Sequence, residues 1–245
     1  MGDRYWRRFK ENTFKKKMSI KIIKDYYLKD DTRYNRVTSV LDYFRPPSLF
    51  NWAIDIGKKE YKDRTKEAKK IGTRVDNLIK QYLLSKKVKL TESDDISVEN
   101  CLKAYFRWKE DYSPMFLDQD KIVSDNELKI AGTYDLLIEP STIVDIKCSN
   151  QISLNYWLQV AMYAKMAGAK NIAILRLDKM TADYEYVVKE FDEQYVSLFL
   201  GLLINYRYHN QKGESNGNNT DSNIAGKVEG SSDSTIREVK KEYGF

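Results

Sequence analysis

The sequence contains few of the residues that build several common kinds of protein site. Only two of its 245 residues are cysteine, Cys101 and Cys148, which excludes a disulfide scaffold and any zinc or iron–sulfur site built from four cysteines. The single histidine, His209, excludes a metal site with two histidines and removes the commonest general base. We therefore expect any catalysis to depend on carboxylates, lysine, tyrosine or a metal ion held by oxygen ligands.

Long hydrophobic runs are also missing. No stretch of about 18 or more consecutive apolar residues occurs, so the sequence predicts no transmembrane helix and no membrane partner. Residues 1–8 lack the apolar segment of a secretory signal, which predicts a cytoplasmic protein. An apolar fraction of 42% and a charged fraction of 32% are typical of a globular protein rather than a disordered one.

The positive charge is concentrated at the start of the chain. The formal net charge is +6, and residues 1–36 hold 12 Lys and Arg against five Asp and Glu. Such an arm is typical of proteins that bind a polyanion, most often nucleic acid, although a solubilising terminus accounts for it equally well. Four aromatic residues near these charges could stack on bases: Tyr5, Trp6, Tyr26 and Tyr27.

The length predicts one domain with extensions at both ends. We expect a basic arm over residues 1–35, with poor order over 1–17. The folded domain is expected over 36–210. Residues 211–245, which are rich in Gly, Ser, Asn and Asp, predict a flexible tail of low complexity.

Hydrophobic periodicity predicts helices and strands in a mixed order. Apolar residues three, four and seven apart indicate helices, and short runs with alternating or β-branched residues indicate strands. The order is helix, helix, three strands, helix, strand, strand, helix, which predicts an α/β or α+β domain with a mixed central sheet flanked by helices. The main helices are expected at 58–84, 96–112, 153–168 and 192–208, and the strands at 116–123, 127–139, 142–147, 171–177 and 183–190.

The residues that could carry chemistry lie around one predicted hairpin. Asp145 and Lys147 are two residues apart, so they project from the same face of a strand whose other residues are apolar. A half-buried lysine beside a carboxylate is costly unless the site uses it. With Asp135 from the preceding strand, two carboxylates would hold Mg²⁺ and the lysine would position an attacking water. This set predicts metal-assisted phosphodiester hydrolysis, and the alternative is a surface ion pair on an ordinary hairpin.

The register of this hairpin decides whether Asp135 joins the site. A loop centred on Ser141 places Asp135 opposite Lys147 and on the face of Asp145. A loop centred between Pro140 and Ser141 turns Asp135 to the other face. The hydrolytic hypothesis predicts the first register, or a bulge that restores it.

Three spaced motifs surround the hairpin. They are Gly132-Thr133-Tyr134-Asp135, then Asp145-Ile146-Lys147, then Gln159-Val160-Ala161-Met162-Tyr163. The glutamine and tyrosine of the third motif are four residues apart and share one helix face. Together the motifs resemble those of the PD-(D/E)xK nuclease superfamily, in particular the RecB-type exonucleases. Segments 36–41, 49–53 and 68–75 look like the N-terminal part of the phage and mitochondrial exonucleases of this group.

The resemblance covers about residues 36–178 and implies a fold and residue roles. The fold would have a restriction-endonuclease-like core. Asp135 and Asp145 would be metal ligands, together with the backbone carbonyl of Ile146. Lys147 would be the catalytic lysine. Supporting or DNA-contacting roles would fall to Gln159 and Tyr163.

Three further residues enter through the same resemblance. Thr73 belongs to a Gly-Thr-x-x-His motif of the family, and Asp76 stands at the histidine position. Asp76 would bind the metal directly or through water, or else be an exposed polar residue of the helix. Glu127, on the strand before Gly132, would approach the metal, or else be an exposed strand glutamate.

The activity implied by the resemblance is that of a Mg²⁺- or Mn²⁺-dependent DNA exonuclease in DNA recombination, repair or replication. Its substrate would be linear DNA ends or single strands, and the likeness to phage sequences suggests a virus or mobile element. No iron–sulfur cluster is expected with two cysteines. The alternatives are an endonuclease of the same fold, of resolvase or restriction type, and a non-catalytic nucleic-acid-binding protein. The intact Asp135, Asp145 and Lys147 argue against the last.

Overall fold

The computed structural model describes residues 20–23, 26–44 and 47–216. Contacts within the chain divide it into two units, Met1–Arg207 and Tyr208–Phe245, and the predicted site lies in the first. The predictions for residues 1–17, including stacking by Tyr5 and Trp6, fall outside the described residues, as does the tail beyond Asn216.

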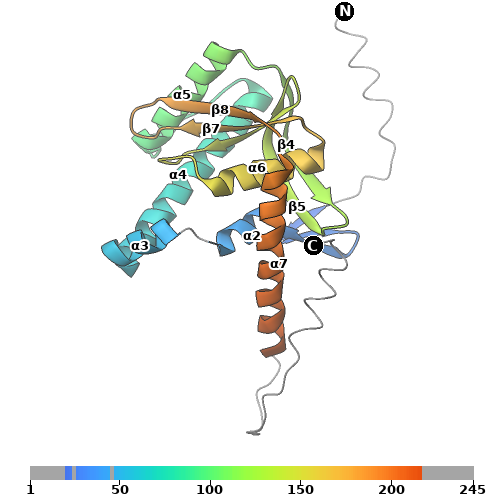
Figure 1. Cartoon of the computed structure of the whole chain (residues 1–245). Helices are drawn as coiled ribbons and strands as arrows, with labels where there is room; N and C mark the ends of the chain where they lie inside the picture. The colour runs from blue at the N-terminus through green and yellow to red at the C-terminus, as the bar shows by residue number, and fades with distance from the viewer. Residues whose placement is uncertain (1–19, 24–25, 45–46, 217–245) are drawn as a thin grey trace, which may run out of the picture. The chain divides into compact units, whose positions relative to one another are not determined.

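The first unit is built on a mixed sheet of eight strands (Figure 1). The strands are β1 (Lys21–Ile23), β2 (Tyr26–Lys29), β3 (Thr32–Arg36), β4 (Phe116–Asp125), β5 (Ile130–Ile138), β6 (Thr142–Lys147), β7 (Asn171–Leu177) and β8 (Tyr184–Glu190). Their order is β1-β2-β3-β5-β6-β7-β8, and β4 pairs with β5 off this path. The pairs β3–β5 and β6–β7 are parallel and the other neighbours are antiparallel. The predicted class, a mixed α/β sheet flanked by helices, is confirmed.

Strand β5 is the branch point of the sheet. β4 pairs along one edge of β5, from Ile130 to Ile138. The other edge is shared, because Ile130 and Ala131 pair with β3 while Leu136 to Ile138 pair with β6. Within the described part of the chain, Gly132–Asp135 has no strand partner on that edge. The first predicted motif therefore lies where the sheet divides.

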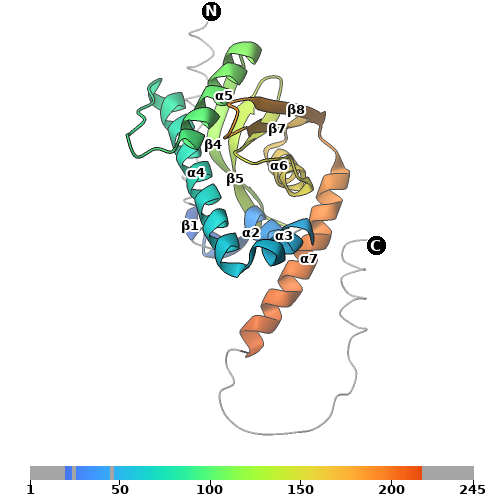
Figure 2. The same cartoon turned by 90° about the vertical axis from the view of Figure 1, so that its left-hand side faces the viewer.

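Helices cover both faces of the sheet (Figure 2). The helices are α2 (Val37–Tyr43), α3 (Pro47–Ile56), α4 (Lys58–Ser85), α5 (Ile96–Tyr112), α6 (Leu154–Ala167) and α7 (Glu193–Asn216). α4 and α5 pack on one face, against Val144, Ala173 and Leu175. α2, α6 and the part of α7 before Tyr208 pack on the other, against Ile143, Ile172 and Ile174. Because alternate residues of β6 and β7 enter the two cores, these strands are nearly continuous apolar runs.

Local sequence signals set several helix ends. The Asp95 side chain accepts a hydrogen bond from the Ser97 N–H at 2.7 Å and so caps α5. α6 ends at Gly168, whose φ of 71° suits glycine at a helix C-terminus. Among the described residues, no helix is both long enough and apolar enough to cross a membrane.

The sheet begins earlier in the chain than the sequence analysis expects. Strands β1 and β2 and most of β3 lie within residues 1–35, which the charge pattern assigns to a basic arm. Tyr27 and Tyr34 pair across β2 and β3, and both are buried. Burial of these rings anchors the strands, while charge alone indicated only an arm. The expectation that Tyr27 stacks on bases is wrong, because only 3% of this residue is exposed.

Three other boundaries shift by a few residues. β4 continues to Asp125, and β5 begins at Ile130 rather than at residue 127. Glu127 consequently lies in the turn between these strands, not on a strand. α7 continues to Asn216, so the first residues of the expected tail are helical.

Candidate active site

The β5–β6 hairpin has a register that differs from both of those expected from the sequence. Leu136 pairs with Val144 and Ile138 with Thr142, so the loop is centred on Pro140. The predicted centre at Ser141 is therefore wrong by one position. Continuing the observed register places Asp135 opposite Asp145, and residues opposite one another share a face. The site survives because a shift of the loop centre by one whole residue moves the pairing by two and preserves the face.

Asp135, Asp145 and Lys147 meet at the end of this ladder. The Ile146 N–H donates to Oδ2 of Asp135 at 2.7 Å. Nζ of Lys147 lies 2.7 Å from Oδ2 of Asp145, whose side chain is 1% exposed. This oxygen has no hydrogen bond of good geometry among the described residues, so its contact with Lys147 is an ion pair. The arrangement joins two carboxylates and one ammonium group on a single face.

Burial and mutual charge shift the pKa values of all three groups. Burial, followed by the charge of Asp145, raises the pKa of Asp135 to about 7. Burial also raises the pKa of Asp145, although Lys147 opposes this. Burial lowers the pKa of Lys147, but the charges of Asp145 and Asp135 outweigh it and the net pKa is raised. The lysine is thus a cation at neutral pH, whereas the pair Asp135 and Asp145 favours its protonated form more strongly than free aspartates do.

Helix α6 brings the third motif onto the carboxylates. Nε2 of Gln159 donates to Oδ1 of Asp145 at 3.2 Å and to the Tyr163 hydroxyl at 3.1 Å. A Cβ atom on Gly132 would lie 2.3 Å from Cε1 of Tyr163, so only glycine leaves room for the tyrosine ring. This close approach is the physical reason for a glycine three residues before Asp135. The three predicted motifs therefore meet at one place.

Of the three remaining predicted site residues, Asp76 lies within electrostatic range of the two carboxylates, whereas Thr73 and Glu127 are exposed. The charge of Asp76, on α4, raises the pKa values of both Asp135 and Asp145, which places it within electrostatic range. Thr73 is exposed on the same helix. Glu127 is exposed in the β4–β5 turn, and the part of β5 from Ile130 to Asp135 spans roughly 17 Å.

Two contacts at the site were not foreseen from the sequence. The Tyr27 hydroxyl of β2 lies 2.9 Å from Oγ1 of Thr133, and so ties the N-terminal strands to the divided edge of β5. Nζ of Lys147 lies 5.2 Å from the ring centroid of Tyr156, which indicates a cation–π contact. Neither pair has a spacing that sequence periodicity detects.

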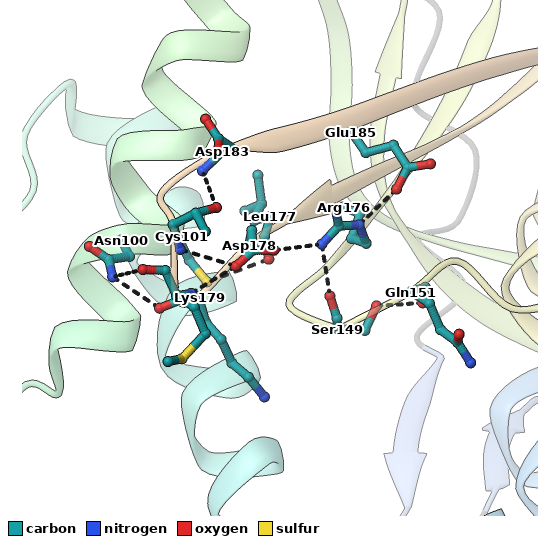
Figure 3. Close-up of polar contacts among 12 residues, drawn as sticks. Asn100, Cys101, Ser149, Gln151, Arg176, Leu177, Asp178, Lys179, Asp183 and Glu185 are labelled. Atoms are coloured by element: carbon teal, nitrogen blue, oxygen red, sulfur yellow. Dashed lines mark hydrogen bonds and ion pairs between the residues drawn. The ribbon is translucent and has the colours of Figure 1, made fainter. Parts of the chain in front are cut away.

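Arg176 of β7 is a further residue near the site that the sequence did not predict. It pairs with Lys147 in the parallel β6–β7 ladder. Its guanidinium donates to Glu185 at 2.8 Å, to Asp178 at 3.1 Å and to the Ser149 carbonyl at 3.4 Å (Figure 3). Ser149 lies in the loop between Lys147 and α6, so Arg176 restrains the segment that joins two site motifs. The sequence offered no signal beyond one arginine in an apolar strand.

The turn that follows Arg176 is held by helix α5 (Figure 3). Nδ2 of Asn100 donates to the carbonyls of Lys179 and Met180 at 3.0 and 3.2 Å. The Cys101 thiol points to the Leu177 carbonyl at 3.8 Å. These contacts hold the β7–β8 turn and so restrain the end of β7 that carries Arg176.

The site offers oxygen ligands of the kind that Mg²⁺ takes. The ion is usually held by one or two carboxylates together with water and substrate phosphates. Within the described residues, no group of three or more His, Cys, Asp or Glu side chains is arranged to hold a metal. Two observations nevertheless fit a cation beside Asp135 and Asp145. Oδ2 of Asp145 is buried and has the Lys147 ammonium group beside it but no hydrogen bond of good geometry among the described residues, and burial and the charge of Asp145 raise the pKa of Asp135. The donor set of two carboxylates therefore fits Mg²⁺ or Mn²⁺.

Comparison with known proteins finds similarity in structure but not in sequence. No family model and no curated protein matches the chain. The alkaline exonuclease LHK-Exo from Laribacter hongkongensis is 14% identical, with a TM-score of 0.39 over 74% of this chain and 94% of its own. Its complex with dAMP is 10% identical, with a TM-score of 0.39 over 70% and 85%. A phage-related exonuclease from Haemophilus somnus is 10% identical, with a TM-score of 0.34 over 52% and 75%.

Proposed function

We propose that this chain is a Mg²⁺- or Mn²⁺-dependent deoxyribonuclease that acts as an exonuclease on linear DNA ends or single strands. The observation that carries the proposal is the meeting of Asp135, Asp145 and Lys147 on one face at the divided edge of the sheet. Two acids and a lysine in this arrangement suit hydrolysis of a phosphodiester. The proposed setting is DNA recombination, repair or replication.

Each residue has a definite task in the proposed reaction. When bound, the ion supplies Lewis-acid stabilisation of the phosphate and a water of lowered pKa. Asp135 and Asp145 hold it, and Gln159 orients Asp145 through Oδ1. The ammonium group of Lys147 positions the attacking water and offsets charge that develops on the phosphate oxygens. Burial of this set strengthens each of these electrostatic effects.

Digestion of end-labelled linear DNA tests the proposal. Single- and double-stranded substrates are incubated with Mg²⁺ or Mn²⁺ beside closed circular DNA. We expect loss of linear but not circular DNA, and a fall of at least about 10²-fold in rate for Lys147→Ala. The matched control is Lys103→Ala on α5, because Lys103 forms an exposed ion pair with Glu99 away from the site.

The other outcomes identify the alternatives. Cutting of closed circles that requires Lys147 would indicate an endonuclease of resolvase or restriction type. DNA binding without cutting by either metal would indicate a non-catalytic binding protein. In that case Mg²⁺ should also fail to raise the unfolding temperature, whereas the nuclease should show a rise that Asp135→Asn and Asp145→Asn abolish.

A further inference from the structure

A second lysine stands between two carboxylates beside the proposed site. Nζ of Lys80 lies 2.9 Å from Oδ2 of Asp76, one turn earlier on α4, and 2.7 Å from Oδ1 of Asp120 on β4. The three side chains are 30%, 42% and 48% exposed, respectively. This arrangement links helix α4 to strand β4 through one ammonium group.

Two observations place the network near the proposed metal ligands. Asp120 lies between two paired positions of β4, since Gln119 pairs with Leu136 and Lys121 with Tyr134. It therefore stands level with Asp135 on the neighbouring strand. Asp76 acts on both Asp135 and Asp145 through its charge. Asp76 is thus in contact with Lys80 and within electrostatic range of any cation bound by Asp135 and Asp145.

The two ion pairs of this region differ in how easily they break. Asp145 is fully buried against Lys147, so removal of either partner would leave an uncompensated buried charge. The pair between Lys80 and Asp76 is partly exposed, and exposed pairs of this kind contribute little to stability. If Asp76 left Lys80, the lysine would still have its ion pair with Asp120. Asp76 and Asp120 can therefore both exchange their partner at small cost, and of these two it is Asp76 whose charge acts on Asp135 and Asp145.

We propose that Lys80 is a positioning residue that competes with the bound divalent ion for Asp76. In the metal-free protein Lys80 holds Asp76 and neutralises it near the buried Asp145 and the half-buried Asp135. When the ion binds, Asp76 turns to it as a third carboxylate, and Lys80 remains paired with Asp120. This inference rests on the proposed function, because it requires an ion at Asp135 and Asp145.

Titration of the full-length protein with Mn²⁺, without DNA, tests the competition. Free Mn²⁺ is followed by electron paramagnetic resonance, so no catalytic activity is needed. We expect Lys80→Met to tighten Mn²⁺ binding by about two- to fivefold, because the competitor is removed. We expect Asp120→Asn to weaken it by a similar factor, because Lys80 then has only Asp76.

A double-mutant comparison separates this competition from a simple change of local charge. If Lys80 acts through Asp76, Lys80→Met has no effect on Mn²⁺ affinity in an Asp76→Asn background. If it acts only through its long-range field, the effect persists there, and the inference is overturned. Lys103→Met is the matched control, since Lys103 has the same spacing to Glu99 at 2.8 Å, and we expect no change.

The remaining outcomes distinguish the inference from the proposed function. No Mn²⁺ binding by the wild type, or binding that Asp145→Asn leaves unchanged, would refute the metal site itself. Binding that requires Asp145 but is unchanged or weakened by Lys80→Met would overturn the competition alone. If Lys80→Met does not fold, as judged by its thermal transition, the opposite shift expected of Asp120→Asn decides the question.

Discussion

At the scale of single residues, Gly132 shows how one position connects sequence to chemistry. The ring of Tyr163 occupies the space that a side chain at position 132 would need, and this ring is buried and hydrogen-bonded to Gln159. Gln159 in turn holds Asp145. A side chain at position 132 would displace the Tyr163 ring, and with it Gln159 and its hydrogen bond to Asp145.

We expect Gly132→Ala to lower the free energy of unfolding by about 1–3 kcal/mol, because the added carbon overlaps a buried ring that has no free space. Urea denaturation measures the change. Gly201→Ala is the control, since a Cβ there meets no atom within 4 Å. Alanine at this helical position should leave stability equal or slightly raised. A Gly132→Ala protein as stable as the wild type would show that Tyr163 does not pack against this glycine.

At the scale of elements, the loop from Lys147 to α6 joins the two halves of the site. Arg176 of the neighbouring strand restrains the conformation of this loop through the Ser149 carbonyl. The turn that follows Arg176 is itself held by hydrogen bonds from Asn100 of α5. The geometry of the proposed site therefore depends on the contacts that Arg176 of β7 makes with this loop and with Glu185 of β8.

We expect Arg176→Met to reduce kcat for DNA hydrolysis by about ten- to a hundredfold with little change in KM, because misplacement of a catalytic group by about 1 Å has effects of this size. Arg176→Lys should recover part of the rate. Steady-state kinetics on linear DNA, beside thermal unfolding, provide the measurement.

Arg107→Met is the control for this element. Arg107 forms an exposed ion pair with Asp183 and donates to the Ala182 carbonyl, both in the same β7–β8 turn rather than in the loop after Lys147. Its kcat should remain that of the wild type. Equal losses of kcat in both variants would show that the turn, rather than the Ser149 contact, determines the rate.

What could be foreseen at this scale was local. The pairs Asp145 and Lys147, and Gln159 and Tyr163, each lie within one element, so strand and helix periodicity predicted their shared faces. The hairpin centre at Pro140 was missed because the sequence does not fix the register of a short loop. The contacts of Lys80 with Asp120 and of Arg176 with Ser149 were missed because they join segments distant in the chain.

At the scale of the whole molecule, the site imposes a dependence of stability on pH. The folded protein raises the pKa of Asp135 from 3.8 to about 7, so folding favours the protonated acid. A raised carboxyl pKa contributes stability below the unfolded value and loses it as the pH rises through the folded value. The stability contribution of Asp135 should therefore fall between about pH 4 and pH 7.

Thermal unfolding in EDTA across this range measures the effect. The unfolding temperature of the wild type, relative to Asp135→Asn, should decrease as the pH rises from 4 to 7. Added Mg²⁺ should reverse the decrease near pH 7, because the ion binds the ionised acids of the folded state. A constant difference between the two proteins across the range would contradict the raised pKa.

The divided edge of β5 also has a consequence for the order in which the chain is synthesised. Asn35 and Arg36 of β3 pair with Ile130 and Ala131, roughly 95 residues later, whereas β5, β6 and β7 follow one another closely. At a synthesis rate of about 5–20 residues per second, the N-terminal strands wait about 5–20 seconds for the strand they join. During that interval β3 has an open edge and Tyr27 has no Thr133 to bind. Closing of the sheet around the site is therefore a late event in the life of the nascent chain, and the N-terminal strands need protection from other partners until β5 emerges.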